Sequence, residues 1–246
     1  MAKLTFVGTG DAFGSGGRMN TCLFVETPDL VFAIDFGATS LAALNALELD
    51  HGEIDLILLT HFHGDHAAGI PGMLLDSMVA RKRTRPLTIA GPPGVEAHLA
   101  KVMSAFFPGS EKMAPRFPLT WHEIAIQAPQ DVMGLRVTTY PAAHPPETMP
   151  TSMRIETPRG KVIAFTGDSA WTEHMPDLAA GSDVFISECY FHAKPVPNHM
   201  NYPALRENRD RLKTKRLILT HMGPEMLAMA ANVPEETAYD GMVIEI

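Results

Sequence analysis

Short runs of β-branched and apolar residues recur along the chain, separated by turns rich in glycine and proline. These runs predict strands at residues 3–8, 22–26, 30–35, 54–59, 87–90, 135–139, 161–166, 183–187 and 216–220. Apolar positions at helical spacing predict helices near residues 38–49, 70–81, 93–106, 202–213 and 223–229. Strands and helices interleave in both halves without a low-complexity linker. The pattern therefore predicts a layered α/β architecture in one domain spanning residues 1–246.

The predicted strand at residues 54–59 ends in a cluster of side chains that commonly bind metals. A solvated loop is the alternative, but the chain has only 11 histidines in 246 residues, which disfavours a chance cluster. His61 and His63 are two residues apart, so an extended chain places both on one face, and Gly64 can then turn the chain. Imidazole and carboxylate are the usual ligands of divalent ions. The candidate ligands in this loop are His61, His63, Asp65 and His66.

Three later predicted strands also lead into candidate ligands, which are His144, Asp168 and His221. Each residue alone is more typical of an ordinary loop, and Asp168 lies in a Gly-Asp-Ser sequence that favours a turn. Strand ends and their loops converge in layered α/β folds, where binding sites form. The combination therefore predicts a metal site with ligands from several strands.

Composition and charge limit the classes of protein to consider. The net charge of −8 and the pI of about 5.7 argue against a surface built for nucleic acid. Residues 81–85 (RKRTR) are a basic exception, which either meets an anionic substrate or forms a solvated loop. No apolar run approaches the roughly 18–20 residues of a transmembrane helix. Without a signal-peptide pattern, and with only Cys22 and Cys189, the chain is predicted to be cytoplasmic with buried free thiols.

The motif HFHGDH at residues 61–66, followed in order by His144, Asp168 and His221, resembles the metallo-β-lactamase-fold superfamily. The resemblance extends over nearly the whole chain. It implies a four-layered αβ/βα sandwich with the site along one edge, between the sheets. It also implies that His61, His63 and His144 hold a first metal, that Asp65, His66 and His221 hold a second, and that Asp168 bridges the two.

A binuclear centre of this kind implies hydrolytic chemistry. Two divalent ions roughly 3.5–4 Å apart can share a bridging hydroxide, which acts as the nucleophile near neutral pH. The resemblance also implies that Asp65 accepts a proton from the nucleophile or orients it. Zinc is the expected metal, and manganese and iron are the alternatives that this ligand set accepts.

Within the superfamily, the chain most resembles the ribonuclease Z group and its smaller phosphodiesterase relatives. Residues 183–189 (DVFISEC) match the stretch that supplies a glutamate in that group, here Glu188. His199 follows where the group has a histidine that donates a proton to the leaving oxygen, although His199 could instead cap the helix predicted from residue 202. Two departures stand out: residues 187–190 read SECY where ribonuclease Z usually has His-Glu-Ala-Thr, and the basic, glycine-rich tRNA-binding arm has no counterpart.

These departures disfavour tRNA and favour a small phosphodiester as the substrate. One alternative is a lactonase or β-lactamase-like carbonyl hydrolase, which would not need the pair Glu188 and His199. Another is a non-catalytic member that binds metal or a protein partner, which the full ligand set disfavours. Relatives in the superfamily are often homodimers, and the sequence leaves the oligomeric state open.

Overall fold

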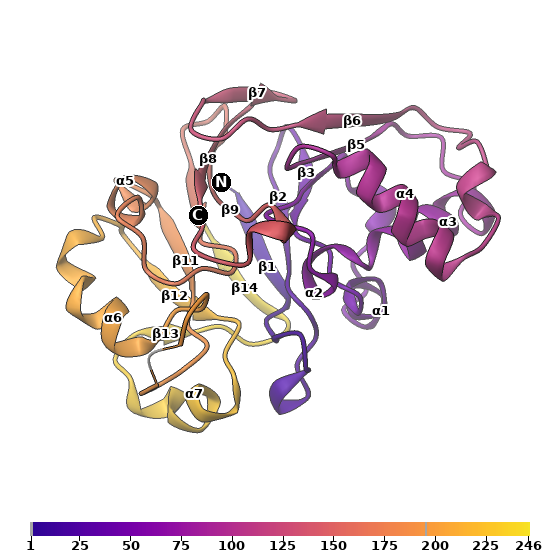
Figure 1. Ribbon diagram of the computed structural model, residues 1–246. Coiled ribbons are helices and arrows are strands. Elements are labelled where there is room, and N and C mark those ends of the chain that lie inside the picture. Colours follow the sequence, from indigo (N-terminus) through magenta and orange to yellow (C-terminus); the bar gives the residue numbers. More distant parts are fainter. Residues whose placement is uncertain (1, 195) are drawn as a thin grey trace.

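The computed structural model describes residues 2–194 and 196–246, in which two seven-stranded sheets pack face to face (Figure 1). The first sheet has the strand order β14 (Met242–Glu245), β1 (Lys3–Gly8), β2 (Cys22–Glu26), β3 (Val31–Ile34), β4 (Leu56–Leu58), β5 (Leu87–Gly91) and β6 (Leu119–Glu123). The second has the order β13 (Glu236–Thr237), β12 (Leu217–Thr220), β11 (Val184–Glu188), β10 (Val162–Phe165), β9 (Thr151–Glu156), β8 (Leu135–Pro141) and β7 (Gln130–Val132).

Helices cover the outer face of each sheet, which gives the four layers of an αβ/βα sandwich (Figure 1). The first sheet is covered by α1 (Ser40–Ala46), α2 (Gly64–Ala67), α3 (Ile70–Val79) and α4 (Val95–Phe106). The second is covered by α5 (Met175–Ala179), α6 (Tyr202–Glu207) and α7 (Pro224–Met229). Short 3-10 helices lie at Ser15–Gly17, His51–Glu53, Ser110–Lys112, Pro146–Thr148, Arg209–Arg211 and Ala230–Asn232. The layered architecture predicted from the sequence is confirmed.

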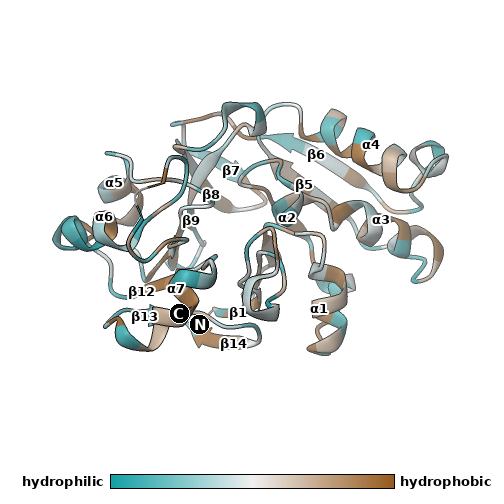
Figure 2. Cartoon of the chain, turned by 60° about the horizontal axis from the view of Figure 1, so that its bottom comes forward, coloured by the Kyte–Doolittle hydropathy of each residue, from teal (hydrophilic) through white to brown (hydrophobic). Residues whose placement is uncertain are grey.

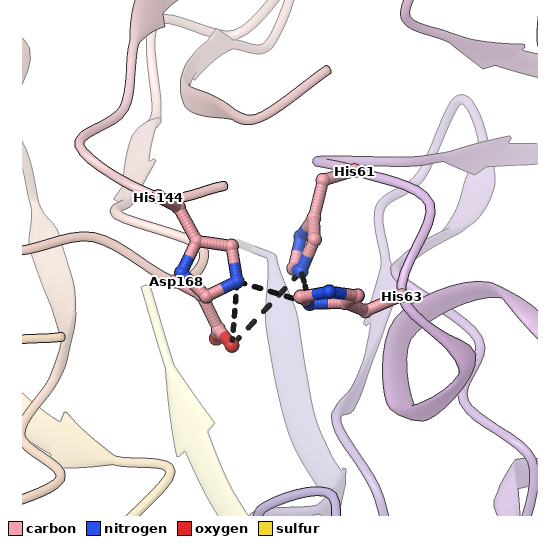
Figure 3. A group of neighbouring side chains, drawn as sticks. All are labelled: His61, His63, His144 and Asp168. Carbon is pink, nitrogen blue, oxygen red and sulfur yellow. Dashed lines mark hydrogen bonds and ion pairs between the residues drawn. The ribbon is translucent and has the colours of Figure 1, made fainter. Parts of the chain in front are cut away.

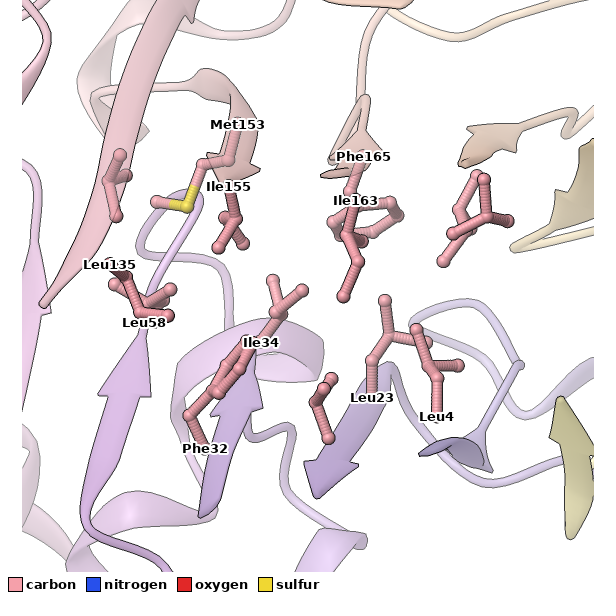
Figure 4. Packing of buried hydrophobic residues seen from close by; sticks show 14 of the residues in the cluster. Leu4, Leu23, Phe32, Ile34, Leu58, Leu135, Met153, Ile155, Ile163 and Phe165 are labelled. Carbon is pink, nitrogen blue, oxygen red and sulfur yellow. The ribbon is translucent and has the colours of Figure 1, made fainter. Parts of the chain in front are cut away.

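The alternation of side chains along each strand builds the core. In β3, Phe32 and Ile34 face the second sheet, whereas Ala33 between them faces the helices. Figure 4 shows residues such as Leu58 meeting Met153 of the opposite sheet. In Figure 2 the strand β14 is brown, whereas the edge strand β6 and several loops are teal. Both sheets are therefore buried on both faces over much of their length.

The direction of the strands places the loops that carry the candidate ligands at one edge of the two sheets. Strands β3 to β6 run parallel, and so do β10 to β13. Both β1 and β3 are antiparallel to β2, so they point the same way, and the pairings with β9 align β8 with β10. The loops that follow β1, β3, β4, β8, β10, β11 and β12 therefore leave the carboxyl ends of their sheets, where α/β folds usually bind ligands.

The helix predicted at residues 202–213 is shorter in the structure. Its α-helical part ends at Glu207, and a 3-10 turn follows at Arg209–Arg211. Asn208 is the C-cap residue, and the carbonyl of Ala204 accepts from both its side-chain amide at 2.9 Å and its backbone N–H at 3.3 Å.

Among the residues that the structure describes, no helix has the length and apolar character needed to cross a membrane. Cys22 and Cys189 are buried and free, as the sequence predicts.

Candidate metal centre

The histidine-rich loop leaves the carboxyl end of β4 and turns directly into α2. His63 is the N-cap residue of α2 and still has an extended backbone, with φ −66° and ψ 152°. The amide of Phe62 donates to the carbonyl of Thr148, and the amide of Thr151 donates to that of Thr60, each at 3.0 Å. These bonds tie the loop of the first sheet to the second sheet, so ligands from both sheets meet.

One cluster brings together His61, His63, His144 and Asp168, whose candidate ligand atoms all lie within 4.8 Å of one another (Figure 3). The Nδ1 atom of His63 lies 3.3 Å from Nε2 of His61 and 3.0 Å from Nε2 of His144. The Oδ2 atom of Asp168 is 3.9 Å from His61 Nε2 and 3.8 Å from His144 Nε2. Three rings and one carboxylate therefore point at a shared space.

A second cluster brings together Asp65, His66, Asp168 and His221 within the same 4.8 Å limit. The Oδ1 atom of Asp168 is 3.1 Å from His66 Nε2 and 3.5 Å from His221 Nε2. The Oδ2 atom of Asp65 is 3.4 Å and 3.1 Å from the same two nitrogens. Asp168 thus directs one oxygen at each cluster, as a bridging carboxylate would.

Buried polar atoms in the second cluster lack hydrogen-bond partners within the described chain. They include Nε2 of His66 and Oδ1 of Asp168, which lie close together without the alignment of a hydrogen bond. Leaving such groups unsatisfied costs roughly 1–3 kcal/mol each. A divalent cation would satisfy both atoms at once, so the donor set fits a metal.

The pKa shifts at the first cluster also favour metal binding. Burial is the largest cause that lowers the pKa of His61, His63 and His144, which keeps these rings neutral. Burial alone would raise the pKa of Asp168, but His221 and His66 hold it well below its ordinary value. Neutral imidazole and ionised carboxylate are the forms that bind a metal.

The second cluster behaves differently when no metal is present. Burial opposes the charged forms of His66 and His221, but the carboxylates of Asp168 and Asp65 outweigh it and raise the pKa of both rings, that of His221 to about 10. These histidines hold protons that a metal would displace. Metal binding at this cluster would therefore release protons and would strengthen as the pH rises.

Asp35, which was not predicted from the sequence, holds His66 of the second cluster through the ring nitrogen that faces away from the cluster. Its fully buried carboxylate lies 2.7 Å from Nδ1 of His66 and accepts from the amide and the hydroxyl of Thr60 at 2.8 Å and 2.7 Å. Because Asp35 accepts the proton on Nδ1, the Nε2 atom of His66 is left free to face the cluster. The signal was available, because Asp35 follows the carboxyl end of β3 as the predicted ligands follow their strands.

Glu188 and His199 lie together at the edge of both clusters. Oε1 of the buried Glu188 contacts Nδ1 of His199, and Oε2 accepts from the amides of Ser169 and Met200 at 2.7 Å and 3.2 Å. The helix-capping alternative for His199 is wrong, because the side chain of Asn201 caps α6. Burial lowers the pKa of His199, but its hydrogen bond to Glu188 outweighs this and raises the pKa above its ordinary value.

These residues open into a cavity of about 650 Å³. Its lining residues are Ala12, Phe13, Asn20, Ala38, His63, Gly64, Asp65, His144, Asp168, Tyr190, Phe191, Val196, His199 and His221. Other histidines of the described chain are used elsewhere: His192 stacks on Tyr202 with the rings 5.7 Å apart, and His51 lies 2.8 Å from Asp76. The metal clusters are therefore accessible to a small molecule from one side.

The basic stretch at residues 81–85 does not reach this cavity, so its interpretation as a substrate contact is wrong. Arg83 is buried and donates to backbone carbonyls, including those of Ile54 at 2.6 Å and Pro86 at 2.7 Å. Arg85 pairs with Asp55 at 2.7 Å. These cations serve the structure, because nearby carbonyls and carboxylates take up their charge.

Comparison with known proteins places this geometry among related chains. A family model described as the β-lactamase superfamily domain matches residues 33–222. The ribonuclease Z of Methanothermobacter thermautotrophicus is 33% identical over 145 residues, which is 58% of this chain and 45% of that protein. The chain thus spans less than half the length of this relative.

Two further proteins resemble the chain over most of its length. The ribonuclease Z of Lachnoclostridium phytofermentans is 24% identical over 279 positions, covering 92% of this chain and 89% of that protein. That alignment is longer than the 246 residues here, so the relative contains segments that this chain lacks. The crystal structure of a diphosphatase from the PhnP family has a TM-score of 0.79 at 19% identity and covers 100% of this chain and 98% of that one, a likeness of fold.

Proposed function

This chain belongs to the β-lactamase superfamily, and from that premise we propose that it is a metal-dependent hydrolase that acts on small phosphodiesters. The ligand assignment is part of the proposal. His61, His63 and His144 would hold a first divalent ion, Asp65, His66 and His221 would hold a second, and Asp168 would contribute a ligand to each. Zinc is the preferred metal, since this mixture of imidazole and carboxylate suits it, with manganese and iron as alternatives.

The contact between Glu188 and His199 carries the choice of a phosphodiester. An alkoxide leaving from phosphorus is a strong base, so its departure benefits from a proton donor. His199 lines the cavity next to the ring of His144, with ring centroids 4.9 Å apart, and its pKa is raised by the bond to Glu188. Carbonyl hydrolysis at such a metal centre needs no pair of this kind.

Each residue has a defined task in this mechanism. When bound, the two ions polarise the phosphoryl oxygen and lower the pKa of a water molecule that serves as the nucleophile. Asp65 orients that water or accepts its proton. His199 donates a proton from Nε2 to the leaving oxygen, while Glu188 holds Nδ1 and fixes the orientation of the ring. Asp35 fixes the tautomer of His66.

The net charge of the protein and the length of its chain both favour a small substrate. The named relatives are ribonucleases, so an RNA phosphodiester is the nearest comparison. The net charge of −8, and the extra segments of the longer relative, both argue against a large polyanion such as tRNA for this chain. A compact phosphodiester is the substrate class that agrees best with both observations.

The test uses metal-reconstituted protein and substrates of three classes. We expect turnover of two phosphodiesters. One is bis-p-nitrophenyl phosphate, and the other is the dinucleotide uridylyl-adenosine (UpA), which has an alkyl leaving group. We expect little turnover of a chromogenic cephalosporin or of a simple lactone. His199→Ala should reduce the rate on UpA by roughly 10²–10⁴-fold, because a general acid contributes about that much. The loss should be smaller on bis-p-nitrophenyl phosphate, because p-nitrophenolate leaves without a proton.

His192→Ala is the matched control. It removes a histidine of the same loop that packs on Tyr202 and does not line the cavity. Metal content is measured in each variant by inductively coupled plasma emission spectroscopy. This measurement distinguishes a lower rate caused by loss of the proton donor from a lower rate caused by loss of metal. Equal losses on both diesters in His199→Ala, or preferential lactone turnover, would reject the phosphodiesterase with His199 as its acid.

A further inference from the structure

Phe13 is an exposed aromatic residue at the mouth of the metal cavity. Its side chain is 84% exposed, yet the loop that carries it is well held. The carboxylate of Asp11 accepts from the amide of Phe13 at 3.2 Å, and from the amide and hydroxyl of Ser15 at 2.8 Å and 2.6 Å. The ring is therefore presented to solvent by a loop whose conformation is already fixed before a ligand arrives.

A second apolar wall faces the same cavity from the loop after β11. Tyr190 and Phe191 lie side by side, with ring centroids 4.5 Å apart, and Val196 extends the wall. Burial, and after it the nearby carboxylate of Asp11, raise the pKa of the Tyr190 hydroxyl to about 12, so Tyr190 lies close to the carboxylate that organises the Phe13 loop. The two apolar parts of the cavity lining therefore meet near Asp11. Metal binding needs only the histidines and aspartates, so these apolar side chains are available to contact a ligand.

The cavity lining contains no lysine or arginine in the part of the chain that the structure describes. A substrate with several phosphates would bring charges that no side chain here neutralises, and nucleic-acid grooves normally supply such cations. A ligand with a single phosphodiester group has one negative charge, and the metal centre neutralises that charge. The rest of such a ligand must match apolar and aromatic side chains.

We propose that Phe13 forms a binding subsite for an aromatic group, such as a nucleobase, on the ester arm that stays with the phosphate. This inference rests on the proposed phosphodiesterase activity. Phe13 follows β1 of the first sheet, whereas His199 follows β11 of the second. The leaving oxygen lies at His199, so the other ester arm extends toward Phe13. Aromatic rings accept stacked bases without regard to sequence.

The experiment compares two substrates that release the same chromophore, phenyl p-nitrophenyl phosphate and methyl p-nitrophenyl phosphate. They differ only in the arm that stays with the phosphate, so their ratio of kcat/KM reports the subsite. In Phe13→Ala this ratio should fall by at least about fivefold, mostly through KM, since stacking contributes at least that much. Phe13→Trp, which keeps an aromatic ring, should retain the preference.

Phe106→Ala is the control, because Phe106 is also an exposed aromatic residue, at 56%, but lines a neighbouring groove on α4. Calorimetric binding of phenylphosphonate and methylphosphonate gives a second readout that needs no turnover. A phenyl-to-methyl ratio that is unchanged in Phe13→Ala, or that falls in Phe106→Ala instead, overturns the subsite. Absence of diester turnover in the native protein would instead reject the proposed function, so the two failures are distinguishable.

Discussion

Replacing Asp35 by asparagine tests whether the support behind the metal cluster controls metal affinity. The carboxylate meets three donors, the amide and hydroxyl of Thr60 and Nδ1 of His66. In Asp35→Asn the amide oxygen can still accept from the Thr60 amide, and the Thr60 hydroxyl can rotate to accept from the new NH₂ group. Nδ1 of His66 cannot adapt in this way, because its N–H would face the NH₂ group of the new side chain, and two donors cannot form a hydrogen bond.

The expected loss follows from this single mismatch. His66 must move its proton from Nδ1 to Nε2, the atom that faces Asp168 at 3.1 Å and would bind the metal. One charge-assisted hydrogen bond is lost, which is worth about 1.5–3 kcal/mol. Changes of this kind behind a ligating histidine typically reduce metal affinity by about 10–100-fold, or roughly 1.4–2.7 kcal/mol. The two estimates agree.

The assay is zinc competition against a chromophoric chelator at pH 7.5, with affinity and stoichiometry determined for each variant. Asp76→Asn is the matched control, since Asp76 also holds a buried histidine, His51, at 2.8 Å, but away from the clusters. Melting curves in chelator separate a general loss of stability from a loss of metal. If Asp35→Asn and Asp76→Asn bound zinc as tightly as the native protein, the support assigned to Asp35 would be refuted.

Three further predictions test other parts of the site and fold. His63→Ala should lose metal at the first cluster and most hydrolysis, and unchanged metal content by plasma emission would contradict the ligand set. Arg83→Met should lower the free energy of unfolding in urea by about 3 kcal/mol, because buried carbonyls lose their donor. Exposed Arg85→Met should cost less than about 1 kcal/mol. His199 is protonated below its raised pKa, so kcat on an alkyl diester should fall as pH rises through that pKa, and Glu188→Gln should move this alkaline limb to lower pH.

The candidate ligands could be predicted because their information is local. The spacing of His61 and His63 predicts an extended stretch with both side chains on one face, and Gly64 predicts the turn that follows, which the structure forms as α2. His144, Asp168 and His221 follow strands that share a direction, so the carboxyl-end rule brings them together without knowledge of the packing. That they bind metal remains a prediction.

Features that depend on pairing between distant segments were missed. Asp35 was placed inside the strand predicted at residues 30–35, but the chain leaves β3 after Ile34 and Asp35 adopts φ 57°. Its role depends on the register of β3 beside β4, which puts it next to Thr60. The basic stretch at residues 81–85 was ambiguous for the same reason, because its partners come from the segment before β4.

Several strands were also missed, and all of them except β14 lack a run of apolar residues. In β9 only Met153 and Ile155 enter the inter-sheet core, and polar residues alternate with them. The other missed strands are β6, β7, β13 and β14, and the helices α2 and α5 were missed as well. Each lies at a sheet edge or is short, except β9, so neighbouring strands rather than their own propensity determine them.

Glu188 connects the two halves of the proposed chemistry. Its Oε1 contacts Nδ1 of His199 and lies 3.6 Å from Nδ1 of His221, whose Nε2 faces Asp65 and Asp168. One buried carboxylate thus orients the proton donor and also places its negative charge beside a candidate metal ligand, without a hydrogen bond to that ligand. A substitution at Glu188 therefore changes proton donation and metal affinity together, whereas His199→Ala leaves the ring of His221 in place. The roles can be separated only if metal content is measured alongside rate, because a rate loss in Glu188→Gln that exceeds the loss in His199→Ala must arise at the metal side of the site.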